Sequence, residues 1–178
     1  LVAYSGFSAS NYLVQPYNAD LDFGTGDFSF SVWCYPTVAN GNENRYIFDF
    51  STPGGGDRLY TQLDSGGGIK SGFDANPNGH VADNVWSYVT FCRRSGIGYT
   101  YVNGVNVNAT SFAENFSETT RKLYIGIRFS LSNNVWLGKM ALLRISATAP
   151  TAAQILEIYN AEKPLFQENA KCTLNGSS

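Results

Sequence analysis

The sequence predicts an all-β protein, a two-sheet antiparallel sandwich with one short helix near its C-terminal end. Three observations support this fold class. About ten short apolar-alternating segments are separated by turn residues every 8–12 residues or so. One segment alternates strictly at period 2, and the helical period appears only once, after residue 150. Because each strand has one apolar face, two sheets must pack against each other to bury those faces.

The most regular alternation lies in the stretch from Asp20 to Tyr35. The residues expected in the core are Phe28, Phe30, Val32 and Cys34, and those expected on the opposite face are Ser29, Ser31, Trp33 and Tyr35. Gly24 and Gly26 form a turn before this strand, and Pro36 ends its pairing. The outward face is either solvent or a concave ligand platform, unless Trp33 and Trp86 serve as core or cross-strand packing.

The other strands are expected at 11–15, 46–50, 58–63, 69–73, 85–93, 99–102, 105–107, 123–129 and 135–145. In segment 46–50, the residues expected on one face are Tyr46, Phe48 and Phe50. Asn103-Gly104 predicts a tight hairpin.

The helix is predicted over residues 151–162. Thr151 and Gln154 have the spacing of a capping box, and Ile155, Ile158 and Tyr159 form one apolar stripe. Pro164 ends the helix.

Length and composition indicate a single globular domain. The chain has 178 residues, of which 43% are hydrophobic and only 15% are charged, below the typical level of about 25%. We expect a sandwich over 1–163 and a tail over 164–178, which is either a last edge strand or a linker to a following domain. The chain starts at Leu1 rather than Met, so we expect an excised domain, a processed product or a part of a longer polypeptide.

Charge and cysteine content exclude several partners. The net charge is −2, and the only basic pairs are Arg93-Arg94 and Arg121-Lys122, so no nucleic-acid partner is expected. No apolar run approaches the ~20 residues of a membrane span. Three cysteines without CxxC spacing and a single histidine argue against a zinc site, and we expect Cys34, Cys92 and Cys172 to be unpaired.

Six segments occur in an order that resembles a known family. They read LDFGTGDFSFSVW, VWSYVTFCRR, YTYVNGVNV, LYIGIR, LGKMALLRIS and TAAQILEIYNAE. In this order they resemble the laminin-G-like (LamG) branch of the concanavalin A-like lectin/glucanase superfamily, from about Phe7 to about Lys163. The resemblance implies a jelly-roll β-sandwich, and it says little about function, since the superfamily contains enzymes, lectins and structural modules.

Catalytic patterns are missing. Glucanases of this superfamily carry Glu-x-Asp-x-Glu on one strand, and no such pattern occurs. His80 lies in a polar loop with Asp74 and Asp83 as its nearest acids, and no Gly-x-Ser-x-Gly accompanies it. We therefore expect a protein that is not an enzyme.

No cofactor is expected either. Relatives bind Ca²⁺ through an early Asp and a late acidic pair, and the matching positions here are Ser8, Ala141 and Leu142. Ca²⁺ needs six to eight oxygens, several of them anionic. Only Asp20, Asp22 and Asp27, close to the turn before the strand that begins at Phe28, offer carboxylates that could form a different Ca²⁺ site.

With catalysis and a cofactor disfavoured, the remaining function is ligand binding by surface loops and aromatic side chains. Sugars stack on aromatic rings while amides and carboxylates fix their hydroxyls. The candidate ligand-binding residues on these grounds are Asp74, Asn76, Asn78, His80, Trp136 and Tyr60.

The leading functional hypothesis is a non-catalytic recognition or adhesion module that binds a glycan or a protein partner at a surface. The alternative is a structural domain of a larger assembly, such as a phage tail or capsid decoration, in contact with neighbouring protein subunits. A glycoside hydrolase is disfavoured by the missing acids. Both leading hypotheses place the protein outside the cell or on a virion surface.

Overall fold

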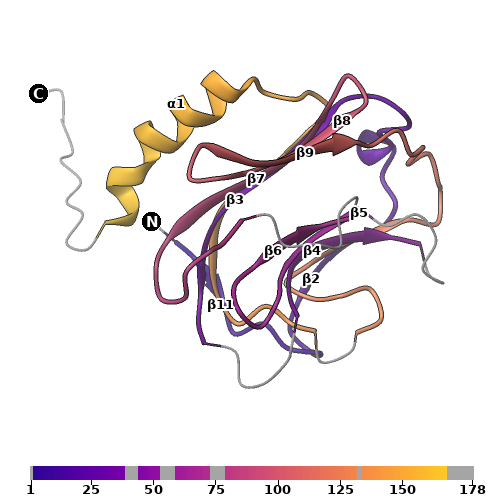
Figure 1. The fold of residues 1–178 in the computed structure, drawn as a ribbon. Helices are drawn as coiled ribbons and strands as arrows, with labels where there is room; N and C mark the ends of the chain where they lie inside the picture. The colour runs from indigo at the N-terminus through magenta and orange to yellow at the C-terminus, as the bar shows by residue number, and fades with distance from the viewer. Residues whose placement is uncertain (1, 39–43, 53–58, 73–78, 132–133, 168–178) are drawn as a thin grey trace, which may run out of the picture.

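In the computed structural model two antiparallel sheets face each other (Figure 1). The structure describes residues 2–38, 44–52, 59–72, 79–131 and 134–167. The six-stranded sheet contains, in spatial order, β1 (Tyr4–Ser5), β11 (Gly138–Ser146), β3 (Phe28–Pro36), β7 (Ser87–Arg94), β8 (Ile97–Val102) and β9 (Val105–Ser111). The five-stranded sheet contains β2 (Leu13–Gln15), β10 (Lys122–Ile125), β4 (Arg45–Ser51), β5 (Leu59–Leu63) and β6 (Ile69–Ser71). The predicted all-β sandwich is confirmed.

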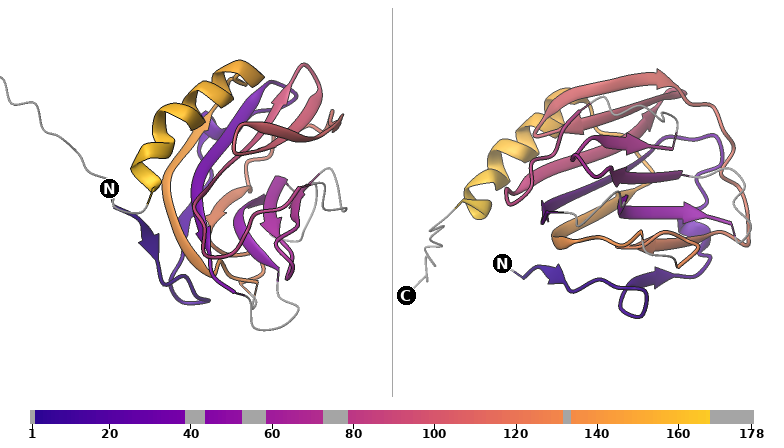
Figure 2. Two further views of the ribbon diagram at one scale, coloured as in Figure 1. Left: turned by 60° about the vertical axis from the view of Figure 1, so that its left-hand side comes forward. Right: turned by 60° about the horizontal axis from the view of Figure 1, so that its bottom comes forward.

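The helical elements lie outside the sandwich. They are η1 (Ala19–Leu21), α1 (Ala152–Glu162) and η2 (Lys163–Phe166). Helix α1 lies along the outer side of the six-stranded sheet (Figure 2). Within the described residues, no helix is both long and apolar enough to cross a membrane.

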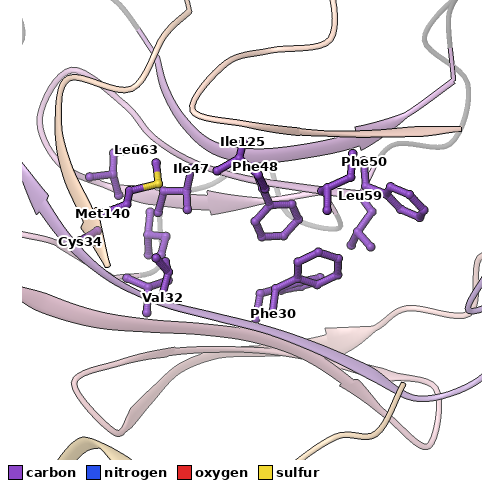
Figure 3. Close-up of a cluster of buried hydrophobic side chains, with 14 of the residues drawn as sticks. Phe30, Val32, Cys34, Ile47, Phe48, Phe50, Leu59, Leu63, Ile125 and Met140 are labelled. Carbon is purple, nitrogen blue, oxygen red and sulfur yellow. The ribbon is translucent and has the colours of Figure 1, made fainter. Parts of the chain in front are cut away.

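The core lies between β3 and β4, the third strand of each sheet. The predicted inward residues Phe28, Phe30, Val32 and Cys34 are all buried in the inter-sheet cluster. The Phe30 ring stacks on the Phe48 ring across the two sheets, with centroids 4.3 Å apart and 12° between their planes (Figure 3). The sequence therefore assigned the two faces of this strand correctly.

A β-bulge in β4 changes one predicted face. The register shifts between Tyr46 and Phe48, so Ile47 and Phe48 both enter the core. Tyr46 is buried elsewhere, against Tyr60 at 5.6 Å between ring centroids. The expectation that Tyr46 shares the face of Phe48 and Phe50 is wrong, because the extra residue inverts the alternation on one side of it.

The predicted tight hairpin at Asn103-Gly104 and the predicted capping box at the start of the helix are both confirmed. Asn103 and Gly104 both have positive φ (52° and 81°), as the tight hairpin between β8 and β9 requires. A Cβ on Gly104 would lie 2.7 Å from Leu156 Cδ1 and 3.2 Å from Leu156 Cα of α1, and the positive φ itself favours glycine at this position. Thr151 caps α1 through a complete capping box with Gln154.

Two predicted segments differ from the observed elements: the strand at 123–129 is shorter, and the tail begins with a helical turn. Strand β10 ends at Ile125, because Gly126 has φ 81° and lies against Phe7. Residues 163–166 form η2, which includes the first three residues of the expected tail, and Phe166 is 9% exposed. The start of the segment assigned to the tail is thus packed on the sandwich.

Two of the three cysteines lie in the described residues, and both are free and buried. Burial raises the pKa of the Cys34 thiol to about 12 and that of Cys92 to about 11. Both thiols are therefore protonated, unreactive packing groups at neutral pH. Cys172 lies outside the described residues.

The Phe30–Phe48 stack predicts the response to a core truncation. Replacing Phe30 by Ala should lower the free energy of unfolding by about 3–5 kcal/mol, the range for large aromatic truncations in a core. Urea unfolding followed by circular dichroism measures the change. Val105→Ala, at a side chain 63% exposed, is the control and should stay within about 0.5 kcal/mol. A loss below about 1 kcal/mol for Phe30→Ala would contradict this packing.

Candidate functional site

Trp33 faces away from the inter-sheet core, and residues of α1 and η2 cover it. Its side chain is 1% exposed. The Phe166 ring stacks on it at 4.1 Å and 12°, and the Tyr159 ring lies 5.7 Å away. The Trp33 indole N–H donates a 2.7 Å hydrogen bond to Glu162 Oε2. The interpretation of Trp33 as a packing residue is confirmed, and it offers no surface to a ligand.

Beside this cluster lies a groove of about 520 Å³, which we call the aromatic groove. Its lining residues are Tyr35, Asn84, Val85, Trp86, Leu165, Phe166 and Gln167. The rings of Tyr35 and Trp86 are partly exposed and lie 5.6 Å apart at 59°. The Trp86 ring also lies 4.9 Å from Phe166.

Local backbone geometry builds the wall of the aromatic groove. Asn84 has φ 60°, a left-handed conformation that asparagine tolerates better than most residues. Its N–H donates a 2.7 Å hydrogen bond to the Pro36 carbonyl at the end of β3. This bond holds the segment before β7 next to β3, so that Trp86 lies beside Tyr35.

The lining of the aromatic groove combines aromatic rings with amide side chains. Aromatic ring faces accept the C–H surfaces of sugars, and the amides of Asn84 and Gln167 can donate to and accept from hydroxyls. The described lining residues include no Asp, Glu, His or Cys. The described lining therefore offers no carboxylate, imidazole or thiol, and the phenol of Tyr35 is its one ionisable side chain.

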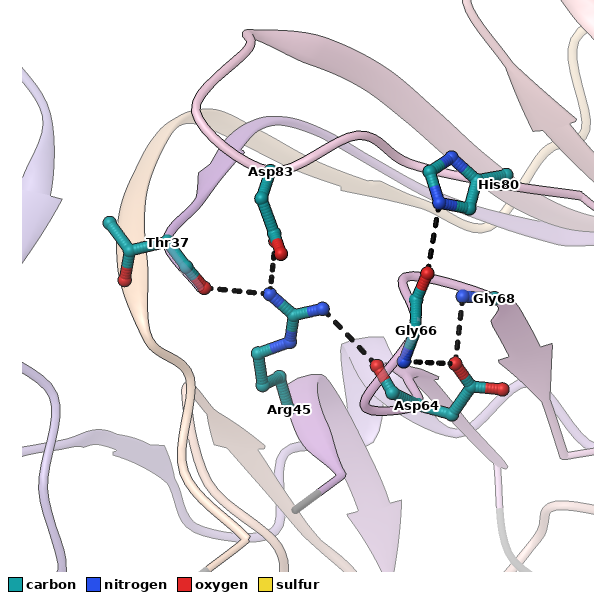
Figure 4. A network of polar contacts seen from close by, with 7 residues as sticks. All are labelled: Thr37, Arg45, Asp64, Gly66, Gly68, His80 and Asp83. Carbon is teal, nitrogen blue, oxygen red and sulfur yellow. Dashed lines mark hydrogen bonds and ion pairs between the residues drawn. The ribbon is translucent and has the colours of Figure 1, made fainter. Parts of the chain in front are cut away.

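A second polar cluster lies at the rim of the sandwich and is structural. The fully buried guanidinium of Arg45 donates to the Asp83 carboxylate, to the Thr37 carbonyl at 2.7 Å and to the Asp64 carbonyl at 3.2 Å (Figure 4). These oxygens come from three separate connections between strands. A buried cation that is paired with such a set holds the connections together, and removing it would leave them unsatisfied.

Of the residues predicted to bind ligand, His80 and Tyr60 occupy separate places. The His80 ring is exposed, and its Nε2 lies 2.9 Å from the Gly66 carbonyl oxygen in the turn after β5 (Figure 4). Tyr60 is partly exposed on the outer face of the five-stranded sheet and packs on Tyr46. Asp74, Asn76 and Asn78 lie outside the described residues.

The prediction for Trp136 is wrong. Its side chain is 0% exposed and belongs to the core between the sheets. Position 136 follows a loop and precedes β11, and the main-chain bond from its N–H to Gly126 turns the residue inward (2.7 Å). Its ring is therefore inaccessible to a sugar.

The outer face of the five-stranded sheet is more closed than the aromatic groove. Asp49 and Gln62 lie on this face and are 0% and 5% exposed. The Phe129 N–H donates to Asp49 Oδ2 at 3.1 Å, so the connection after β10 lies over the middle of the face. Tyr60 and Tyr124 remain partly accessible there.

The aromatic groove contains residues that sequence reasoning missed. Tyr35 was expected to face outward, but Trp86 was treated as packing and Leu165 and Phe166 as tail. An aromatic residue soon after Pro164, outside the helical stripe, hints at docking. No sequence pattern places position 166 beside positions 35 and 86.

The two facing antiparallel sheets define a lectin-like jelly-roll sandwich. The chain belongs to the concanavalin A-like lectin/glucanases superfamily, whose family model matches residues 7–156. No curated protein matches the chain.

Solved structures similar to this chain share its fold at low identity. A protein from Bacteroides ovatus ATCC 8483 described as carbohydrate-binding has a TM-score of 0.62 and 19% identity, over 83% of this chain and 44% of its own. Domain 4 of AbnA, an extracellular arabinanase from Geobacillus stearothermophilus, in complex with arabinotriose, has a TM-score of 0.61 and 14% identity, over 86% of this chain and 74% of its own. The SAP-like pentraxin of Limulus polyphemus has a TM-score of 0.56 and 13% identity, over 86% of this chain and 84% of its own. The chain thus spans less than half the length of the first of these.

The positions that match the family's calcium residues lack carboxylates. Ser8 pairs through its backbone with Asn11, Ala141 is buried, and Leu142 has φ 51° in an irregular part of β11. Asp27 already accepts a 2.8 Å hydrogen bond from the Ser95 N–H. No group of three or more His, Cys, Asp or Glu side chains suited to a metal occurs among the described residues.

We predict that calcium does not stabilise this protein. A ligand that binds only the native state raises stability by RT ln(1 + [L]/Kd), and a hard dication needs anionic oxygens that these positions lack. Melting curves with chelator and with millimolar Ca²⁺ should agree within about 1 °C. A rise of several degrees would show that aspartates and backbone carbonyls elsewhere hold an ion.

Proposed function

We propose that the protein is a non-catalytic recognition module that binds a glycan in the aromatic groove. The observation that carries the proposal is the pair of partly exposed rings, Tyr35 and Trp86, beside two amide side chains in an open groove of about 520 Å³. This volume lies within the usual range of small-ligand sites, roughly 300–1,000 Å³.

The two rings and the amides suit different parts of a sugar. The rings lie at 59° to each other, so two successive sugar units or two faces of one unit can each contact an aromatic surface. Asn84 and Gln167 supply both donors and acceptors for hydroxyls. The exposed Val85 and Leu165, at 52% and 47%, extend the apolar contact at the edge. A neutral oligosaccharide fits a lining without charged groups.

The similar structures agree with a carbohydrate-related role. They include a protein described as carbohydrate-binding, an arabinanase domain with arabinotriose and a botulinum neurotoxin whose cell entry depends on gangliosides. They also include sialidases, so the fold alone does not decide between binding and catalysis. The missing acids in the groove favour binding, and the ligand is then an extracellular or cell-surface glycan.

A glycan array with matched variants tests the proposal. The wild-type protein should bind a limited set of neutral oligosaccharides, and Trp86→Ala should weaken binding about thirtyfold, corresponding to about 2 kcal/mol for a stacked aromatic anchor. Tyr60→Ala, on the opposite sheet, is the matched control and should bind as the wild type does. Circular dichroism and melting curves verify that both variants are folded.

Two outcomes would contradict the proposal. Loss of binding in Tyr60→Ala with full binding in Trp86→Ala would move the site to the five-stranded face. A blank array would reject glycan recognition altogether.

A second candidate function, an assembly domain in a larger particle, is favoured by the N-terminal edge. Strands β1 and β2 are edge strands of the two sheets. They carry exposed apolar residues, with Tyr4 at 60%, Leu13 at 44% and Val14 at 45%. An exposed apolar edge is a template for contact with another chain. A blank array together with ordered oligomers in light scattering would favour this function.

A further inference from the structure

A second groove lies between α1 and the outer face of the six-stranded sheet, and its floor is unexpectedly polar. The groove has a volume of about 420 Å³. Arg144, Ser31 and Thr90 lie directly opposite one another on β11, β3 and β7, so their side chains share this face. A sheet face that packs under a helix usually carries apolar residues, as Trp33 and Ala141 do in the neighbouring row.

Thr90 is the anomaly on this floor. Its side chain is 1% exposed, and its hydroxyl is buried with no hydrogen-bond partner. Three other hydroxyls of the groove are paired: Ser29 donates to the Thr148 carbonyl at 2.8 Å, and the Ser146 and Thr148 hydroxyls bond each other at 2.9 Å. An unpaired buried hydroxyl destabilises the fold, and a valine would occupy the same volume without that cost.

The charge in the groove is balanced within the protein. Arg144 donates to both carboxylate oxygens of Glu162, at 2.5 and 3.2 Å, and Glu162 also accepts the hydrogen bond from Trp33. The carboxylate fixes the guanidinium at the groove, and Arg144 also forms a side-chain hydrogen bond with Tyr88 in the same lining. A ligand there meets donors and hydroxyls but no net charge.

One wall of the groove is apolar. It is formed by Ala149, Pro150 and the partly buried Ile158 of α1. A ligand that fits must combine hydroxyl groups on one side with a C–H surface on the other. Sugars and related polyols have this combination.

We infer that this second groove binds a neutral saccharide unit, with Thr90, Ser31 and Arg144 as its polar contacts. The Thr90 hydroxyl gains its missing partner only when the groove is filled. The site is separate from the aromatic groove and does not depend on the function proposed there.

The test is an NMR titration of the whole chain with D-glucose, D-galactose, D-mannose, L-arabinose and maltose, each up to tens of millimolar. At least one of these sugars should shift the amide signals of Ser31, Thr90 and Ile158 in a saturable way. Thr90→Val should weaken that binding about fivefold or more, the loss typical of one hydrogen bond. Its melting temperature should be unchanged or higher, because the variant removes an unpaired buried hydroxyl.

Thr61→Val is the matched control. Thr61 is also fully buried with an unpaired hydroxyl, but it faces the core opposite Phe48 and lines neither groove. This variant should bind sugar as the wild type does. Trp86→Ala should leave the second groove's shifts in place, which separates this site from the aromatic groove.

Two results would overturn the inference. One is that none of the five sugars shifts the second groove's amides. The other is that Thr90→Val, still folded, binds with undiminished affinity.

Discussion

The stacked rings of Phe30 and Phe48 join the third strands of the two sheets, and the arrangement of both outer grooves depends on this contact. With Phe30 fixed inward, the alternation of β3 directs Ser31, Trp33 and Tyr35 outward. A slip of one residue would exchange the two sets and place a serine and a tryptophan in the core. Packing between the sheets therefore determines which side chains are available for binding on the other side of β3.

The C-terminal segment divides this outer face. Ile155 of α1 is fully buried, and Phe166 of η2 covers Trp33. Glu162 lies between them and bonds both Trp33 and Arg144. The middle of the outer face of the six-stranded sheet is thus closed. The aromatic groove and the second groove lie beside this closed region. One groove is aromatic and the other is lined by hydroxyls, and both lack an unpaired charge.

The fold was largely predictable because its determinants are local. Alternation in β3 specified its faces, Asn103-Gly104 specified a hairpin, and Thr151 with Gln154 specified the start of α1. The bulge at Tyr46 was not predictable, because an extra residue in a strand depends on the partner strand. Trp136 was misplaced for a related reason, since its inward direction comes from a main-chain bond to Gly126 rather than from its neighbours in sequence.

The candidate site was predictable only in part, for the same physical reason. Outward-facing Tyr35 follows from period 2, whereas the groove around it needs Trp86 and Phe166, which are far apart in the chain. Packing of η2 on Trp33 brings them together. The unpaired Thr90 hydroxyl likewise emerges only when the partners of each buried polar group can be examined in three dimensions.

Tryptophan fluorescence tests the central claim, recognition of a glycan in the aromatic groove, most directly. Of the three tryptophans, Trp33 and Trp136 are 1% and 0% exposed, and only Trp86 is partly exposed. Acrylamide should therefore quench mainly Trp86. We predict that a glycan selected on the array shifts the emission to shorter wavelength and protects it from acrylamide in a saturable manner. Saturable binding of that glycan with unchanged quenching would contradict the account, because the sugar would then lie away from Trp86.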